Sequence, residues 1–303
     1  MKKVLIHVLS NAMGDTIASI PYASEYQQKN NCIVYFCVND FYMSFLKDAY
    51  PNITLVGRSH NIEFDERIDI DYNFNKPVQL GYAEQLGFEN AEYIKPSISF
   101  NYKPRSIKNK YVVLSVHSTL QCKHWNHPKG KRVQPEQPYW NELCGMLRKL
   151  GYTPVVLGEY ETFGTPPFFN GVPKKANKKT GVQFDEVLSL IHHSEFFIGL
   201  SSGLSWIAHA MDKKVAIIAN FTEDWNEFDL NDENYVRISN KSVCNGCFNK
   251  INIEHSFDPS DWYWCPKHKG TDRQFECHTS ITPEMVISSI DKLLYQFHID
   301  LFL

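Results

Sequence analysis

Short apolar runs alternate along most of this chain with segments whose apolar residues recur every three or four positions. The run Lys3–Leu9 is typical of a buried strand, and the spacing over Thr16–Gln28 predicts a helix. A second buried strand over Cys32–Val38, a short helix over Tyr42–Tyr50 and a third strand over Thr54–Val56 follow. Because predicted strands and helices alternate along the chain, the pattern predicts an α/β fold with a parallel sheet.

A polar, basic segment at 101–110, interrupted by Pro104, divides this pattern and is typical of a linker. After it the alternation resumes. We expect strands at Tyr111–Val116, Thr153–Leu157, Phe196–Leu200 and Val215–Ala219, and helices at Tyr139–Leu150, Phe184–His192 and Leu204–Met211. The sequence therefore predicts two doubly wound halves.

The stretch 243–280 interrupts the second half, because it is hydrophilic and aromatic and has few aliphatic residues. It carries four cysteines, Cys244, Cys247, Cys265 and Cys277, of which the first two form a C-x-x-C pair. This pattern predicts one tetrahedral metal site whose cation supplies folding energy. Four thiolates suit iron or zinc, and the lack of an open position favours a structural metal. Scattered thiols or two disulfides are the alternative.

A closing helix is predicted after this stretch, because Thr282 can cap it and Pro283 can occupy its first position. The expected organisation is a first domain at 1–105, a second domain at 106–242, a metal lobe at 243–280 and the closing helix at 281–303.

Composition narrows the class of protein. With 303 residues, 43% of them hydrophobic, the chain can fill the cores of two domains. A net charge of -3 and the lack of a long apolar segment argue against a nucleic-acid binder or an integral membrane protein. A peripheral membrane role stays open. The first apolar run is short and contains His7, so it is a poor secretion signal, and we expect a cytoplasmic protein with reduced thiols.

A carboxylate follows the first predicted strand, in the pair Gly14-Asp15. Open parallel sheets hold their sites at the carboxyl ends of their strands, so we expect Asp15 to be catalytic and Gly14 to contact the substrate. The alternative for Asp15 is a role as a helix cap or as a partner of the helix dipole.

Small residues link a strand to a helix in the second half. Such a turn presents backbone N–H groups that bind phosphate, although it is also ordinary N-cap chemistry. The residues assigned to this anion site are Ser201, Ser202, Gly203 and Leu204. Lys123 follows another strand end and is predicted to reach a diphosphate. Trp125, two residues later, is assigned to the same substrate site.

Together these motifs resemble the heptosyltransferases of the GT-B glycosyltransferase fold, and more closely the bacterial autotransporter heptosyltransferases. The resemblance covers nearly the whole chain, and its most specific part is the cysteine run. It is carried by Gly14-Asp15 with Pro21, by Gln121–Asn126, by Ser202–Trp206, by Phe221-Thr222 with Glu227-Phe228, and by the run Cys244–Cys277.

The resemblance implies two Rossmann-like domains facing a cleft, with the cysteine lobe at the C-terminal side. It implies an inverting transfer of heptose from ADP-heptose to serine hydroxyls of an autotransporter protein in the cytoplasm, before export. It further implies iron at the cysteines, with zinc as the alternative, and a homo-oligomer. Members of the family carry an additional N-terminal domain, whereas this sequence starts at the first strand of the catalytic part.

In this interpretation Asp15 is the general base, and Lys123 and the Ser202 turn stabilise the leaving diphosphate, so no divalent cation is needed at the chemistry. A lipopolysaccharide heptosyltransferase with a lipid-linked acceptor is one alternative, and a non-catalytic sugar-nucleotide-binding assembly protein is another. A rubredoxin-type protein would need a second C-x-x-C pair. The sugar, the base, the acceptor and the subunit number are left open.

Overall fold

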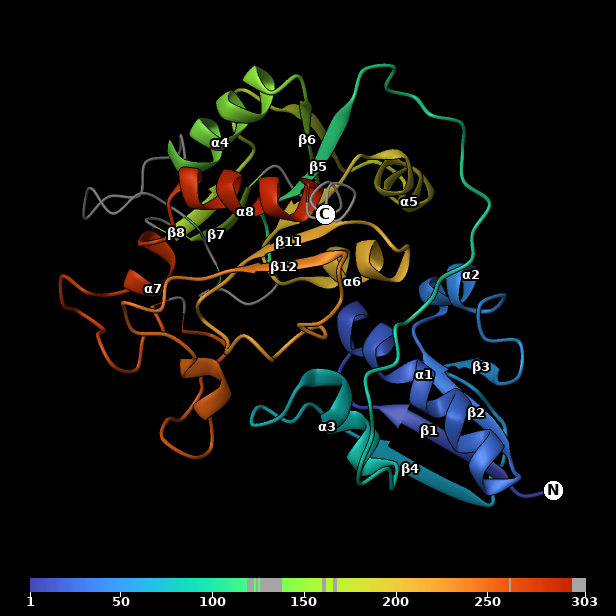
Figure 1. Ribbon diagram of the computed structural model, residues 1–303. Coiled ribbons are helices and arrows are strands. Elements are labelled where there is room, and N and C mark those ends of the chain that lie inside the picture. The colour runs from blue at the N-terminus through green and yellow to red at the C-terminus, as the bar shows by residue number, and fades with distance from the viewer. Residues whose placement is uncertain are drawn as a thin grey trace, which may run out of the picture.

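The computed structural model describes residues 1–118, 123, 125, 138–159, 162–165, 168–261 and 263–295. They form two parallel sheets with helices around them and a cysteine-containing lobe beside both (Figure 1). Residues 89–110, which include the segment expected to link the domains, contain no helix or strand and run from one sheet to the other.

The first domain is built on a four-stranded sheet in the order β3-β2-β1-β4, with every pairing parallel. Its elements are β1 (Lys3–Val8), α1 (Met13–Asn30), β2 (Ile33–Val38), the 3-10 helix η1 (Asp40–Tyr42), α2 (Met43–Leu46), β3 (Thr54–Gly57), β4 (Glu66–Ile70) and α3 (Val78–Gln85). Helix α1 begins three residues before the expected Thr16, since the amide of Thr16 already bonds the carbonyl of Ala12. Gly14 and Asp15 therefore lie in its first turn.

The two faces of this sheet are covered differently. Val4, Ile6 and Val8 of β1 belong to the large core that includes the apolar residues of α1, α2 and α3. Leu5 points to the other face, where it forms a smaller cluster with Cys37 and Val56 that is covered by loop residues such as Phe64. The helices of the first domain thus pack on one face of its sheet.

The second domain is built on a six-stranded parallel sheet in the order β12-β11-β10-β5-β6-β9. Its strands are β5 (Tyr111–Ser115), β6 (Thr153–Gly158), β9 (Asn177–Thr180), β10 (Phe197–Gly199), β11 (Val215–Ile218) and β12 (Tyr235–Ile238), and an antiparallel hairpin adds β7 (Thr162–Thr165) and β8 (Phe168–Gly171). Its helices are α4 (Pro138–Lys149), α5 (Phe184–His193), α6 (Gly203–Ala210) and the closing α8 (Pro283–Tyr295).

Helices cover both faces of this second sheet. Apolar residues of α5 and α6 share a core with one set of alternating strand residues, and those of α4 and α8 share a core with the other set. This is the doubly wound arrangement, and the fully buried strands explain why their sequences read as continuous apolar runs.

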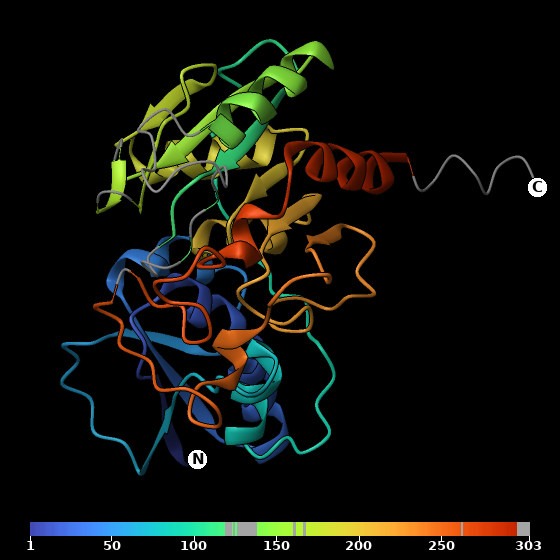
Figure 2. The ribbon, with the colours of Figure 1, turned by 90° about the vertical axis from the view of Figure 1, so that its left-hand side faces the viewer.

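The cysteine lobe contains the 3-10 helix η2 (Cys247–Lys250) and α7 (Glu276–Thr279). Its interior differs from our expectation, because its aromatic rings form a small core together with Phe221 of the second domain. The cluster consists of Phe221, Cys247, Phe248, Ile251, Trp264, Cys265 and Phe275, with Tyr72 and Phe74 of the first domain packed against it. The lobe lies beside the segment before α3 in both views (Figures 1 and 2). Rings therefore supply part of the folding energy that we had attributed to a cation alone.

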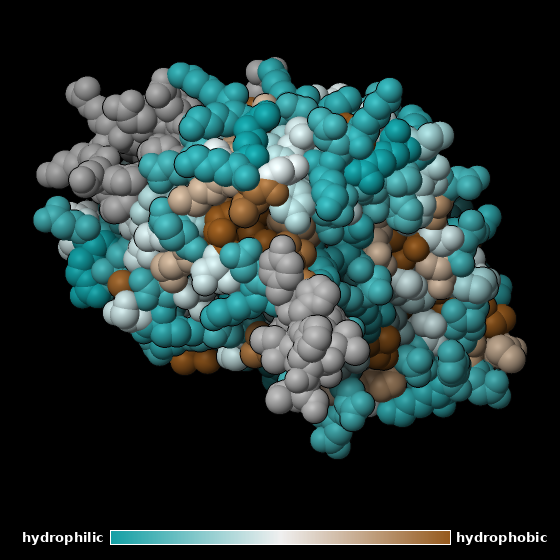
Figure 3. Space-filling model, turned by 45° about the horizontal axis from the view of Figure 1, so that its top comes forward, coloured by the Kyte–Doolittle hydropathy of each residue, from teal (hydrophilic) through white to brown (hydrophobic). Residues whose placement is uncertain are grey.

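Within the described residues, no helix is long and apolar enough to cross a membrane. The face shown in Figure 3 is mostly hydrophilic, with hydrophobic residues in separate patches.

Trp125 lies in the core of the second domain, which corrects its assignment to the substrate site. Its ring is fully buried and packs edge-on against Trp140, with ring centroids 4.7 Å apart. Its Nε1–H donates to the carbonyl of Ile281, at 2.8 Å. A completely enclosed indole that is paired with the backbone before α8 holds the domain together and has no surface to offer a ligand.

We predict that Trp125→Phe lowers the free energy of unfolding by about 1–3 kcal/mol, because the buried carbonyl of Ile281 loses its donor. Urea unfolding checks this, with Trp225→Phe as the matched control at a half-buried position. ADP affinity should stay unchanged in both variants. A variant of normal stability that binds ADP poorly would restore Trp125 to the substrate site.

Candidate functional site

The N-terminal ends of α1 and α6, one from each domain, touch each other. A methyl group on Gly14 would lie 2.8 Å from Cδ1 of Trp206, and one on Gly203 would lie 3.0 Å from Cβ of Met13. The first distance is too short for a side chain and the second would force Met13 to shift by a few tenths of an ångström, so these two glycines favour the close approach of the helices. The contact brings Asp15, in the first turn of α1, next to the Ser202 turn that starts α6.

Asp15 lies in a partly enclosed, largely desolvated position. Burial raises the pKa of its carboxyl group, while a hydrogen bond from Ser10, the charge of Lys123 and the hydroxyl of Tyr82 oppose the shift. Ser10 also accepts a bond from the amide of Ala12, at 3.0 Å, which holds the loop between β1 and α1. A carboxylate with a raised pKa and several donors around it is typical of a general base.

The turn before α6 is organised by its own hydroxyl groups. The amide of Ser202 donates to Oγ of Ser205, at 3.1 Å, in the reciprocal arrangement of a capping box. Oγ of Ser202 lies 3.4 Å from Oγ of Ser115, at the end of β5. The helix start is therefore held at the carboxyl end of the sheet, which is where a helix N-terminus can receive an anion.

Lys123, predicted to reach a diphosphate, lies against this turn. Its Nζ donates to Oγ of Ser201, at 3.0 Å, and to the carbonyl of Ser201, at 3.4 Å. The same ammonium lies 5.7 Å from the ring centre of Phe248, within reach of a cation–π interaction. Its neighbours Gln121, Cys122, His124 and Asn126 lie outside the described residues.

Glu227 is a charged group beside the site to which sequence reasoning gave no role. It is buried, with an ion pair to Arg237 and a hydrogen bond from Thr222. Burial acts to raise its pKa, but the charges of Arg237 and Lys123 outweigh that effect and lower it. The string Glu227-Phe228 contributed to the family resemblance. Arg237, the ion-pair partner of Glu227, lies on β12, and no sequence spacing predicts this pair.

The four cysteines of the lobe surround one small cavity of about 20 Å³, enough for one ion or one water molecule. The sulfurs of Cys244 and Cys247 are 3.7 Å apart. Two thiolates on a tetrahedral ion with metal–sulfur bonds of about 2.3 Å would be about 3.8 Å apart, so this pair fits. Burial and the neighbouring Cys244 raise the pKa of Cys247 to about 12, and thiolates so close together need a cation to balance their charge.

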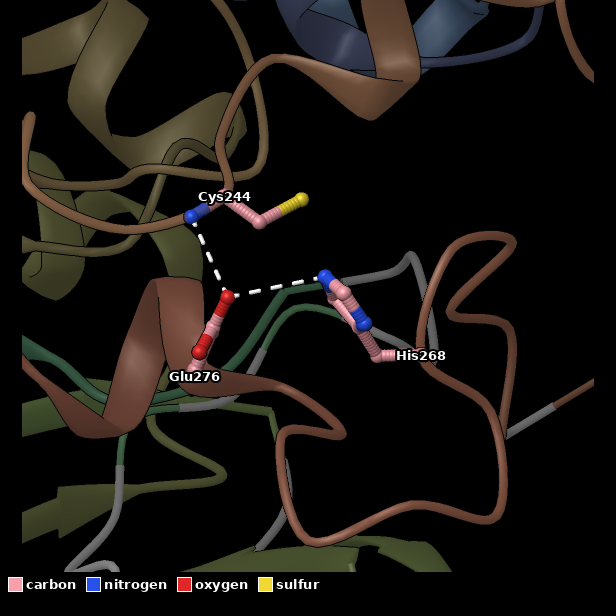
Figure 4. A group of neighbouring side chains, drawn as sticks. All are labelled: Cys244, His268 and Glu276. Carbon is pink, nitrogen blue, oxygen red and sulfur yellow. Dashed lines mark hydrogen bonds and ion pairs between the residues drawn. The ribbon is translucent and has the colours of Figure 1, made fainter.

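A second donor set shares Cys244 and lines the same cavity. The ligand atoms of Cys244, His268 and Glu276 lie within 4.8 Å of one another (Figure 4). Glu276 also accepts from the amide of Cys244, at 3.2 Å, and pairs with Arg273, at 2.6 Å. These bonds already orient Glu276, so we regard it as a carboxylate that supports the loop of Cys244, and His268 as a further candidate ligand.

Comparison with known proteins decides the family. The chain is 34% identical to the autotransporter heptosyltransferase Aah of Escherichia coli over 308 residues, which cover 96% of this chain and 74% of the relative. It is 32% identical to the autotransporter heptosyltransferase BAHTCr of Citrobacter rodentium, over 96% of this chain and 71% of the relative. The chain belongs to the autotransporter heptosyltransferases. No general family model matches it.

Solved structures support the same relationship for this autotransporter heptosyltransferase. The structure of TibC from E. coli, described as an iron-containing dodecameric glycosyltransferase, superposes with a TM-score of 0.85 at 28% identity, over 97% of this chain and 77% of TibC. The E. coli ADP-heptose lipopolysaccharide heptosyltransferase II superposes with a TM-score of 0.63 at 12% identity, which shows a shared fold. The expected GT-B fold is confirmed.

One relative shows that membership of this family does not by itself establish enzymatic activity. An autotransporter heptosyltransferase of Burkholderia thailandensis, BimC, is named inactive and is 26% identical over 95% of this chain. Membership of the family alone therefore does not establish turnover, and the argument for activity depends on the residues of the site.

The raised pKa of Asp15 predicts a stability effect. A carboxyl group whose folded-state pKa lies above its unfolded value favours folding at low pH, and that contribution is lost as the pH rises through the folded-state pKa. At pH 7 the folded protein therefore bears the cost of a buried charge. We expect Asp15→Asn to be more stable than the wild type at pH 7.

Urea unfolding at several pH values checks this, and the difference should shrink as the pH falls towards the ordinary aspartate value of about 3.9. Asp48→Asn, on an exposed position of the same domain, is the control and should change little. An Asp15→Asn protein less stable than the wild type at pH 7 would contradict the burial argument.

Proposed function

We propose that this chain is an inverting glycosyltransferase that moves heptose from ADP-heptose to serine hydroxyl groups of an autotransporter-type protein. Membership of the family supports heptose transfer as the class of reaction. A structure of TibC in complex with ADP-D-beta-D-heptose identifies the donor of that relative. One observation carries the proposal for this chain. A half-buried carboxylate of one domain and a helix start of the other, where an anion could bind, are joined through the Gly14–Trp206 and Gly203–Met13 contacts.

The reaction needs a base on the acceptor side. Asp15 takes the proton of the serine hydroxyl while its oxygen attacks the anomeric carbon of the heptose from the face opposite the diphosphate. The new bond joins the serine oxygen to that carbon, and the bond from the carbon to the phosphate oxygen breaks. ADP leaves with the electron pair, so one displacement inverts the configuration. The raised pKa of Asp15 makes it a stronger base than a solvated aspartate.

The leaving diphosphate needs positive charge. Lys123 lies against Ser201, and the N-terminus of α6 adds its partial positive charge and its backbone N–H groups. Ser201 accepts a hydrogen bond from this ammonium and the charge of Glu227 lies nearby, so we expect the charge on the leaving group to be stabilised without a divalent cation at the chemistry. Gly203 and Leu204 form the first helical residues that approach the phosphates.

We assign iron to Cys244, Cys247, Cys265 and Cys277 as a structural ion, with zinc as the alternative. Four thiolates suit either metal, and the TibC structure is described as iron-containing. When bound, the ion would crosslink segments that a small aromatic core and polar contacts such as Cys244–Glu276 also connect.

We further propose a cytoplasmic homo-oligomer that meets its acceptor before export. The dodecameric description of TibC supports assembly of a related chain, and the buried cysteines Cys32, Cys37 and Cys144 suit a reducing compartment.

Incubation of the metal-loaded protein with ADP-heptose and an autotransporter passenger should add heptose to serine, which intact-mass and peptide mass spectrometry detect. Asp15→Asn should lower turnover by roughly 10²–10⁴-fold, because the proton no longer has an acceptor. ADP affinity should stay within about twofold, since the base acts only as the acceptor attacks. Asp48→Asn is the matched control and should transfer at the wild-type rate.

The same assay separates the competing functions. Donor binding without transfer or hydrolysis would place this chain with the relative named inactive, as a sugar-nucleotide-binding assembly protein. Transfer to lipid-linked oligosaccharide but not to protein would favour the lipopolysaccharide-type enzyme. Near-normal turnover of Asp15→Asn would refute the role of the base.

Elemental analysis of purified protein should find about one iron per chain, held as in other sulfur-ligated sites. Cys247→Ser should lose the metal and lower the free energy of unfolding, whereas Cys32→Ser, in the core of the first domain, should keep the metal. Zinc in place of iron would correct the metal but keep the site. Full metal content in Cys247→Ser would remove that residue from the ligand set.

A further inference from the structure

Phe248 and Asn249 follow directly after Cys247 in η2, and both contact residues on the two sides of the proposed site. Neither residue was singled out by the sequence, because a phenylalanine and an asparagine in a polar stretch carry no recognisable spacing. Both are buried, Phe248 in the aromatic core of the lobe and Asn249 as a polar group.

Both the oxygen and the nitrogen of the Asn249 side-chain amide form hydrogen bonds, and these connect the two domains. Its Oδ1 accepts from the amide of Glu223, at 2.7 Å, in the second domain. Its Nδ2 donates to the carbonyl of Phe74, at 2.8 Å, in the first domain, and to Oδ1 of Asn226, at 2.6 Å. A buried amide with all of these partners specifies one relative position of the three segments, since losing any partner leaves a buried polar group unpaired.

Asn75 completes this contact from the first domain. Its Nδ2 donates to the backbone carbonyls of Asn249, at 2.9 Å, and of Ile251, at 3.1 Å. The exchange is reciprocal, because the Asn249 side chain bonds the backbone at Phe74 while the Asn75 side chain bonds the backbone at Asn249. The segment that carries Asn75 comes shortly after β4, on the same side as Asp15.

Phe248 links the lobe to both halves of the site through its ring. On one side it packs edge-on against Tyr72 and Phe74, at ring-centre distances of 5.8 Å and 5.1 Å. On the other side the ammonium of Lys123 lies 5.7 Å from its ring centre. Tyr72 in turn donates its hydroxyl to Oδ1 of Asn226, at 3.2 Å. Burial and the charges of Glu227 and Asp15 raise the pKa of Tyr72, so its hydroxyl lies near Asp15.

We propose that Phe248 and Asn249 are positioning residues that couple metal binding in the cysteine lobe to nucleotide binding at the Lys123 turn. The inference rests on the proposed function for the identity of the ligand. A cation held by Cys247 would order the next two residues of the same short helix, and these contact Lys123 and the segment at Asn75. Because coupling between two sites is reciprocal, bound nucleotide must also strengthen metal retention.

The first test uses metal-loaded protein and ADP, titrated by isothermal calorimetry. Asn75→Ala breaks the contact from the first domain, away from the cysteines, and should weaken ADP binding about fivefold or more while metal content stays unchanged. Asn90→Ala, on an exposed position of the same domain, is the matched control and should bind ADP as the wild type does.

A second measurement needs no variant. Metal release from wild-type protein to a chelator should slow when ADP is present, and this protection should disappear in Asn249→Asp, which keeps the acceptor but loses both donated bonds. Asn252→Asp, exposed in the same lobe, should retain the protection.

Three outcomes decide the matter. Weaker ADP binding in Asn75→Ala together with ADP-dependent metal retention supports the coupling. Equal ADP affinity in Asn75→Ala and Asn90→Ala, or a rate of metal release that ADP does not change, overturns it while the glycosyltransferase function stands. A wild-type protein that binds no ADP overturns the proposed function, and the coupling with it.

Discussion

The close approach of two helix N-termini is the constraint on which the rest of this structure depends. Gly14 and Gly203 carry no side chain, so α1 and α6 meet with Trp206 and Met13 filling the space between them. That contact joins two sheets whose carboxyl edges would otherwise serve separate sites. It places a half-buried carboxylate beside a helix start at which we propose that the diphosphate binds, and sugar transfer from a nucleotide needs such a pair.

The cysteine lobe adds a second link between the domains, on the side where Lys123 lies. Its aromatic core is too small to be strongly stable alone, and a metal ion at its cysteines would supply the remaining order. Because Phe248 and Asn249 lie next to a predicted ligand, the lobe is both a folding unit and a support for the site. Loss of the metal would then disturb donor binding without any contact between metal and donor.

Much of this arrangement could be predicted from sequence, because buried parallel strands are apolar throughout and the Asp15, Ser202 and cysteine motifs are local. The short edge strands β4, β9 and β12 were not predicted, since charged residues such as those of Glu66–Ile70 hide the strand pattern. Trp125 was assigned to the substrate site from its place in the motif that contains Lys123, and only tertiary packing shows its ring enclosed. Asn249 acts through Phe74, far away in the chain, and Glu227 pairs with Arg237 across the loop before β12, and no sequence spacing reveals either contact.

The most direct measurement is a structure of the metal-loaded protein with a non-transferable fluorinated ADP-heptose. The account predicts the diphosphate at the N-terminus of α6, next to Lys123, with the anomeric carbon turned towards the first domain and a path for a hydroxyl group between it and Asp15. A nucleotide bound elsewhere, or a heptose facing away from Asp15, would contradict the central claim that these two helix ends form one catalytic site.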